Sequence, residues 1–206
     1  MIKEIGKKIT DVIFNNILWF FISLFGILIT FGAATTAMFR VSFQLLKSNE
    51  PTNVLSLFMS SFKENFKEST LVWLILIVMG TPIYLMFHYA LMQDIAWLFV
   101  IAVVSLYQWF LIFLYIFPTM ALFKTPSLAR LFKNVFLLSN SHLFITLKVI
   151  GSLALVVLLM MIHSSLILIA VGLYGVLVSF HTKKLFTPYL TKLNPEAQEG
   201  NEPWPI

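Results

Sequence analysis

Five long apolar stretches dominate the pattern of hydrophobic and polar positions along the chain. They lie at about residues 12–31, 71–89, 95–117, 143–161 and 165–180. A hydrocarbon core about 30 Å thick needs roughly 20 residues of α-helix to cross it. Each stretch meets or approaches that length. The pattern therefore predicts an all-α fold, a polytopic transmembrane helical bundle of about five spans.

The last two spans are separated by an argument from length, because the apolar run 144–180 is almost unbroken. A single helix of that length would be far longer than the bilayer is thick. Two short spans joined at His163-Ser164-Ser165 fit better. This turn contains neither Gly nor Pro, so the pattern defines its boundary only loosely.

Two segments between the first and second spans have an amphipathic pattern. Residues 33–47 carry an apolar stripe opposed by a polar face, and from Val54 an apolar residue recurs at every fourth position. This pattern is typical of helices that lie in the headgroup interface or pack against a bundle. Nothing in residues 68–70 forces a stop, so we expect the second helix to continue into the span at 71–89.

Composition supports a membrane protein, since 59% of the 206 residues are hydrophobic and 11% are charged. A soluble domain usually has about 25% charged residues. We expect one membrane domain over residues 1–193 and a polar, disordered tail over 194–206. The formal charge of +5 fits Lys and Arg that flank spans, so we expect contact with the lipid bilayer and no nucleic acid.

The distribution of Lys and Arg predicts an orientation. These residues gather between spans one and two, between spans three and four, and after span five. The short loops after spans two and four carry neither, and only Asp94 is charged there. Because Lys and Arg concentrate in cytoplasmic loops, the C-terminus and the two amphipathic helices should be cytoplasmic.

The first span leaves two topologies open. Five spans would place Lys3, Lys7 and Lys8 outside, and the balance of ten cations against three favours this count. Alternatively, the first segment enters and leaves by the same face, bent near Gly32. Every Lys and Arg would then be cytoplasmic.

Few polar groups occur at membrane depth, where they are costly and therefore candidates for function. Gln108 lies midway along the third span and could contact a substrate or make an interhelical hydrogen bond. Gly80-Thr81-Pro82 interrupts the second span. Transporters use such breaks at binding sites, but a kink that serves packing alone is also common.

The segment Gly32-Ala33-Ala34-Thr35-Thr36-Ala37 is the second candidate region. Its small residues let another helix approach closely, and its hydroxyls can bond free carbonyls. Arg40 follows one turn later and can reach a phosphate or carboxylate at the interface. The segment is either a tight helix–helix joint or a ligand site, and the candidate binding residues are Thr35, Thr36, Arg40 and Gln108.

We find no pattern that indicates catalysis. The chain has no cysteine, no two of its four histidines have the spacing of a helical metal site, and no span has an Asp or Glu near its middle. No GxSxG, Walker A or dinucleotide-binding pattern occurs. We therefore expect no catalytic residue, no metal and no cofactor, and a chain that is not an enzyme.

Several short motifs lie along the chain: residues 16–19 (NILW), 32–37 (GAATTA), 62–70 (FKENFKEST), 73–75 (WLI), 115–118 (YIFP) and 131–136 (LFKNVF). Together they resemble the YesL family of bacterial integral membrane proteins, a family of unknown function. The resemblance extends over at least residues 15–190. Members are often encoded beside carbohydrate ABC-transporter components and glycoside-degrading enzymes. The resemblance implies an accessory to sugar uptake and implies no site residues.

Two functional hypotheses follow. The first is a non-enzymatic accessory or regulatory partner of a carbohydrate uptake system in the bacterial cell (plasma) membrane, with an ABC-transporter permease or another membrane protein as its partner. The second is a small permease or channel-like facilitator that acts alone, for which Gln108 and the break at Pro82 are the arguments. A third class, a membrane enzyme acting on lipid or glycan, has no visible base, nucleophile or metal set.

Overall fold

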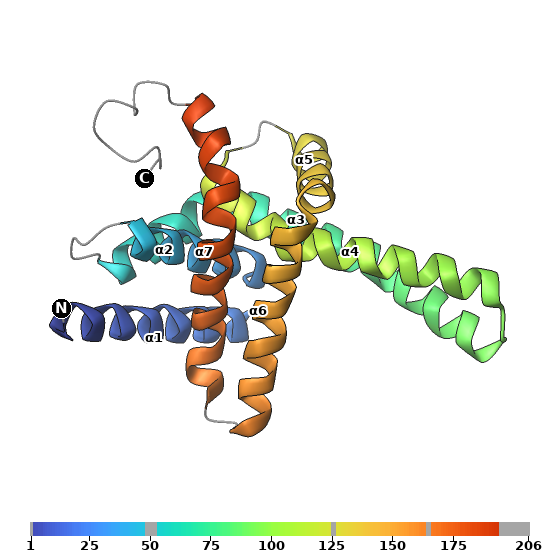
Figure 1. The fold of residues 1–206 in the computed structure, drawn as a ribbon, viewed down its shortest axis with the longest axis horizontal. Coiled ribbons are helices and arrows are strands. Elements are labelled where there is room, and N and C mark those ends of the chain that lie inside the picture. The colour runs from blue at the N-terminus through green and yellow to red at the C-terminus, as the bar shows by residue number, and fades with distance from the viewer. Residues whose placement is uncertain (1, 48–52, 125–126, 164–165, 194–206) are drawn as a thin grey trace.

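Seven α-helices make up nearly all of the part of the chain that the computed structural model describes, residues 2–47, 53–124, 127–163 and 166–193 (Figure 1). The predicted all-α bundle is confirmed. The helices are α1 (Ile2–Phe25), α2 (Phe31–Lys47), α3 (Val54–Met92), α4 (Ala96–Leu122), α5 (Leu128–Ser141), α6 (Leu143–Ile162) and α7 (Ile167–Leu193). Among the described helices, four are long and apolar enough to cross a membrane: α1 over Gly6–Phe25, α3, α4 and α6.

The predicted end of the first span is wrong. Helix α1 ends at Phe25, five residues form a turn, and α2 begins at Phe31. The apolar side chains of residues 27–29 hide this turn from a hydropathy pattern. Two side chains of α3 stabilise it, because the Thr70 hydroxyl donates to the Ile29 carbonyl at 2.7 Å and the Trp73 indole donates to the Ile27 carbonyl at 3.0 Å.

Helices α1 and α2 form an antiparallel hairpin. The Asn15 amide donates to the Met38 carbonyl at 3.2 Å, and the Trp19 indole donates to the Thr35 hydroxyl at 3.0 Å. Asn15 precedes Trp19 in α1, whereas the partner of Asn15 follows the partner of Trp19 in α2, so the two helices run antiparallel. The hairpin bends at residues 26–30, several residues before the predicted bend near Gly32.

Helix α2 lies in the core of the bundle. Every residue from Gly32 to Phe39 is buried, and so are residues 41–43 and Leu45. It packs against α1, α3, α4 and α7. The amphipathic pattern arises because its polar face bonds to neighbouring helices. Of the two predicted placements, packing against the bundle is confirmed for α2.

Helix α3 runs from Val54 to Met92 and continues through residues 68–70, as the sequence predicts. It also continues through Gly80-Thr81-Pro82, so the predicted interruption there is wrong. Its 39 residues span about 58 Å at 1.5 Å per residue. The outer half pairs with α4 to form a long hairpin, which we call the arm, that projects away from the other helices (Figure 1). Pro82 lies inside α3, and Gly80 leaves room for the Trp109 indole, which donates to the Leu76 carbonyl at 2.9 Å.

Helix α5 is an element that the sequence analysis did not predict. Ser127 caps its start by accepting a hydrogen bond from the Arg130 backbone N–H at 3.3 Å. Leu131, Val135 and Ser139 form its buried face. Their spacing of four residues is the sequence signal for this helix.

Helices α6 and α7 form a third hairpin, which crosses the direction of α1 in Figure 1. The predicted span 143–161 lies on α6, and residues 167–180 of the predicted last span lie on α7, although α7 is not among the four helices that meet the length and composition of a span. Residues 164 and 165 of the predicted joint at His163-Ser164-Ser165 lie outside the described residues. Helix α7 continues to Leu193 because Leu185, Phe186 and Leu190 remain buried beyond the predicted end. The predicted tail at 194–206 lies outside the described residues.

Large apolar side chains cover the outside of the arm and of the α6–α7 hairpin. Val78 on α3 is 71% exposed, and Phe144 and Met161 on α6 are 76% and 78% exposed. Exposed apolar surface on this scale is typical of contact with lipid or with another protein. Together with the long apolar helices, it indicates an integral membrane protein.

The contact between α2 and α3 yields a test of stability. A Cβ at Gly32 would clash with the Ser69 carbonyl oxygen and lie 2.9 Å from the Trp73 Cβ. We expect Gly32→Ala to destabilise the protein by about 1–3 kcal/mol, because backbone atoms must move apart. Gly151→Ala is the matched control, since nothing lies within 4 Å of its Cβ position and Ala favours a helix. Thermal unfolding in detergent measures both variants, and equal melting temperatures would contradict the role assigned to Gly32.

Candidate functional site: the polar joint around α2

The side chains predicted as a binding segment form the centre of the helix contacts. The Thr36 hydroxyl lies 2.9 Å from the Ser69 hydroxyl of α3, and both residues are fully buried. Thr36 also donates to the Gly32 carbonyl at 3.0 Å. These bonds join α2 to α3 without an unpaired hydroxyl at either residue.

Thr35 makes the corresponding contact on the other side of α2. Its hydroxyl accepts from the Trp19 indole of α1 and donates to the Phe31 carbonyl at 2.7 Å. The Phe31 ring lies between two indoles, with centroids 5.8 Å from Trp19 and 4.5 Å from Trp73. The two threonines therefore link α2 to two different neighbours.

Arg40 caps the end of α4. One guanidinium nitrogen (Nη1) donates to the Ala121 carbonyl at 2.7 Å. The last carbonyls of a helix have no partner within it and carry the negative end of the helix dipole, so a cation is favourable there. Burial lowers the pKa of Arg40, and the nearby Glu64 carboxylate opposes that shift. The charge is retained, since the ordinary value is far above neutral pH.

A second cation lies just after the same helix end. Lys124 forms an ion pair with Glu64 of α3, and its side chain is 82% exposed. Exposed ion pairs contribute little to stability, typically below about 1 kcal/mol. Glu64 therefore lies between a structural cation, Arg40, and an exposed one, Lys124. We call these three residues the charged cluster.

Gln108 lies away from this region. It is 13 positions before Ala121 on the same helix, which corresponds to about 20 Å. Its side-chain oxygen accepts from the Asn140 amide of α5 at 3.2 Å, the interhelical bond that the sequence analysis offered as one alternative. The Gln108 amide nitrogen is buried without a partner. The structure thus joins Thr35, Thr36 and Arg40 on one helix and separates Gln108 from them.

Two asparagines in α1 belong to the same polar joint and were not singled out from the sequence. The Asn16 side-chain oxygen accepts from the Gly172 backbone N–H of α7 at 2.8 Å. Asn15 bonds α2, and both residues are buried. A pair of amides within an apolar stretch was the available signal, since buried amides need partners.

The chemistry available here is hydrogen bonding and charge pairing. Within the described ranges, no three His, Asp or Glu side chains are placed to hold a metal ion. The Thr35 hydroxyl bonds to α1 and the Thr36 hydroxyl bonds to α3, and neither bonds to a general base. A ligand role for these residues and the non-enzymatic character of the chain stay predictions.

Comparison with known families gives a partial match. Residues 12–87 match the model of a family described as a protein of unknown function, DUF624. The match covers α1 from Val12, all of α2 and most of α3, so it includes Thr35, Thr36, Arg40 and Glu64. No match was found among curated proteins or among solved structures. The similar region contains the side chains of the polar joint, whereas two of their backbone partners, Ala121 and Gly172, lie outside it.

The two cations of the charged cluster are expected to differ in their contribution to stability. Arg40→Gln removes the charge that caps α4, and a hydrogen bond involving a charged group contributes about 1.5–3 kcal/mol. We expect this loss to lower the melting temperature in detergent clearly. Lys124→Gln is the matched control and should change the melting temperature little, because the Lys124–Glu64 pair is exposed. A larger effect of the Lys124 variant would refute this assignment.

Proposed function

We propose that this protein is a non-enzymatic accessory or regulatory partner of a bacterial carbohydrate uptake system, and a YesL-like protein of the plasma membrane. The arm is the observation that carries this proposal. A two-helix projection with free surfaces on both sides offers a large area for another membrane protein. The connection with sugar uptake rests on the resemblance to the YesL family.

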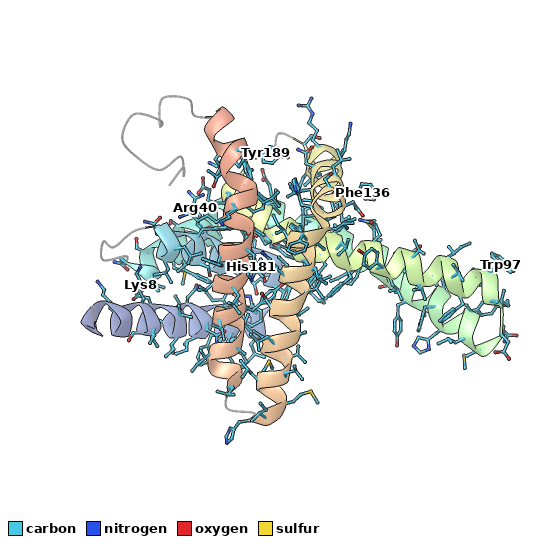
Figure 2. The ribbon with its side chains drawn as sticks, in the orientation of Figure 1. Lys8, Arg40, Trp97, Phe136, His181 and Tyr189 are labelled. Atoms are coloured by element: carbon cyan, nitrogen blue, oxygen red, sulfur yellow. The ribbon has the colours of Figure 1, made fainter. Side chains whose placement is uncertain are left out.

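The two ends of α4 differ sharply in burial. Every residue from Leu114 to Leu122 is buried in the core, whereas Trp97 at the start of α4 is 67% exposed and Val100 is 59% exposed. Figure 2 shows Trp97 at the far end of the arm and Arg40 in the central region. The inner half of α4 therefore anchors the arm, and the outer half is available to a partner.

Polar and aromatic groups on the arm favour a protein partner over lipid alone. Thr81, Tyr84 and His88 are exposed and follow one another at helical spacing on α3. The rings of Tyr84 and His88 are in contact, with centroids 4.5 Å apart. Polar side chains within the membrane usually face protein or a water-filled cavity. A permease subunit of an ABC transporter is the partner we propose for this face.

The facilitator hypothesis remains the second candidate. Its two arguments, Gln108 and the segment Gly80-Thr81-Pro82, are weakened by the contacts that these residues make. Gln108 bonds to Asn140, and the Trp109 indole fills the space beside Gly80. Both features serve packing between helices. Solute flux into proteoliposomes that contain only this protein would favour the facilitator and count against an accessory role.

The α1–α2 hairpin bears on the orientation. Because α2 returns alongside α1, the N-terminus and the end of α2 lie on the same side of the molecule (Figure 1). The tips of the arm and of the α6–α7 hairpin carry no Lys or Arg. We infer that the arm crosses the bilayer, that α1–α2 is re-entrant, and that both termini are cytoplasmic.

Single cysteines test this topology cleanly, because the chain has none of its own. We expect Asp94→Cys at the arm tip to react with a membrane-impermeant maleimide in intact cells. Lys8→Cys and Arg130→Cys should react only after the cells are opened. Labelling of the Lys8 variant in intact cells would instead support a first helix that spans the membrane.

Photo-crosslinking tests the arm as a docking surface. A photoreactive residue at Val100 on the arm is compared with one at Leu158 on α6, because these side chains are 59% and 58% exposed. We expect a discrete protein adduct in native membranes from Val100 and none from Leu158, with a permease subunit identified by mass spectrometry. Equal adducts from both positions, or none from the folded Val100 variant, would argue against this surface.

A further inference from the structure

A pocket of about 360 Å³ lies on the seam between the start of α6 and the last third of α7. The pocket is lined by His142, which immediately precedes α6, by Ile145 of α6 and by four residues of α7: Lys184, Leu185, Pro188 and Tyr189. The two helices are antiparallel here, so the first turn of α6 faces the C-terminal turns of α7. The size is at the low end of the range for small-molecule sites, about 300–1,000 Å³.

The pocket is basic, and none of the described residues that line it is acidic. Lys184 and His142 line it, and one to two turns further along the seam Lys148 and His181 interact electrostatically. Between Asp94 and Glu196 the chain carries six Lys, one Arg and no Asp or Glu. A positive potential is therefore left for an anion from outside this segment.

His142 joins α5 to α6. It is the C-cap of α5 and the N-cap of α6, and its side chain makes no capping bond to α6. The negative end of the α5 dipole and the positive end of the α6 dipole therefore meet here and oppose each other. The pocket itself combines an ammonium group, an imidazole and the Tyr189 hydroxyl.

An exposed apolar surface continues from the pocket along the same hairpin. On α6, Leu143, Phe144 and Leu147 are 60%, 76% and 66% exposed, and on α7 Phe180 is 60% exposed. The Lys148 ammonium lies 5.2 Å from the centre of the Phe144 ring, at the boundary of the charged and apolar zones. Figure 2 shows His181 and Tyr189 along α7, with Tyr189 nearer to its C-terminal end.

We propose that this pocket binds the headgroup phosphate of an anionic membrane phospholipid. Lys184, His142 and Tyr189 provide the donors for the phosphate oxygens. The acyl chains lie against the exposed apolar side chains of α6 and α7. The pocket volume suits a headgroup, whereas the chains need the open surface beside it. Free phosphate shares the headgroup chemistry but gains nothing from that surface, and for this reason we assign the site to a lipid.

The test uses the full chain in a neutral detergent. Native mass spectrometry and thermal unfolding are measured with phosphatidylglycerol, with phosphatidylcholine and with inorganic phosphate. We expect phosphatidylglycerol to bind and to raise the melting temperature. The other two should do neither at the same concentration. Equal effects of the two lipids, or of phosphate alone, would overturn the assignment.

Variants localise the effect to the pocket. Lys184→Gln should weaken phosphatidylglycerol binding about tenfold, the scale of one charged hydrogen bond. Lys184→Arg should keep it. Lys133→Gln is the matched control, because Lys133 is an exposed cation on α5 outside the pocket. Equal losses in the Lys184→Gln and Lys133→Gln variants would show general charge attraction and would refute a site. The result does not depend on whether the arm binds a permease.

Discussion

Backbone groups at helix ends must find partners inside the protein when lipid replaces water, because each unsatisfied group costs several kcal/mol there. The bundle meets this constraint around α2. Thr70 and Trp73 bond the carbonyls of the turn between α1 and α2, and Arg40 bonds a carbonyl at the end of α4. The positions of α3 and α4 relative to α2 follow from these bonds.

Close helix contact is the second condition for this arrangement. Association in lipid relies on van der Waals packing and hydrogen bonds, since the hydrophobic effect does not act between helices in an apolar solvent. Gly32 lets α3 approach α2, Gly172 lets α1 approach α7, and Gly175 lets α2 approach α7. The glycines therefore act together with the buried hydroxyls and amides. The glycines let the helices approach closely, and that short distance allows the hydroxyls and amides to form bonds between helices.

Hydropathy and periodicity predicted much of the fold. The apolar runs correctly predicted helices in the arm and in the α6–α7 hairpin. The absence of a stop at residues 68–70 correctly predicted that α3 continues through them. The turn at residues 26–30 was missed because its side chains are apolar and its carbonyls are bonded by residues more than 40 positions away. Likewise, the burial of α2 depends on partners from four other helices, which a single amphipathic pattern cannot reveal.

The candidate site was predicted in part for the same reason. Small residues and hydroxyls at positions 32–37 indicated close helix contact, and the bonds of Thr35 and Thr36 agree with that interpretation. The partner of Arg40 was not predictable, because Ala121 presents only a backbone carbonyl and lies 81 positions away. Any residue can offer a backbone carbonyl, so the residue type at position 121 does not indicate an acceptor. The Gln108–Asn140 bond, in contrast, joins two polar side chains that are visible in the sequence.

The length of α3 has a mechanical consequence. It is about twice as long as the hydrocarbon layer is thick, and one continuous helix joins the arm to Glu64. The tight contact between Gly32 and Ser69 lies between those two parts. A rigid tilt of α3 about this contact would move its two ends in opposite directions. A neighbour that displaced the outer end of the arm would thereby change the distance between Glu64 and Arg40.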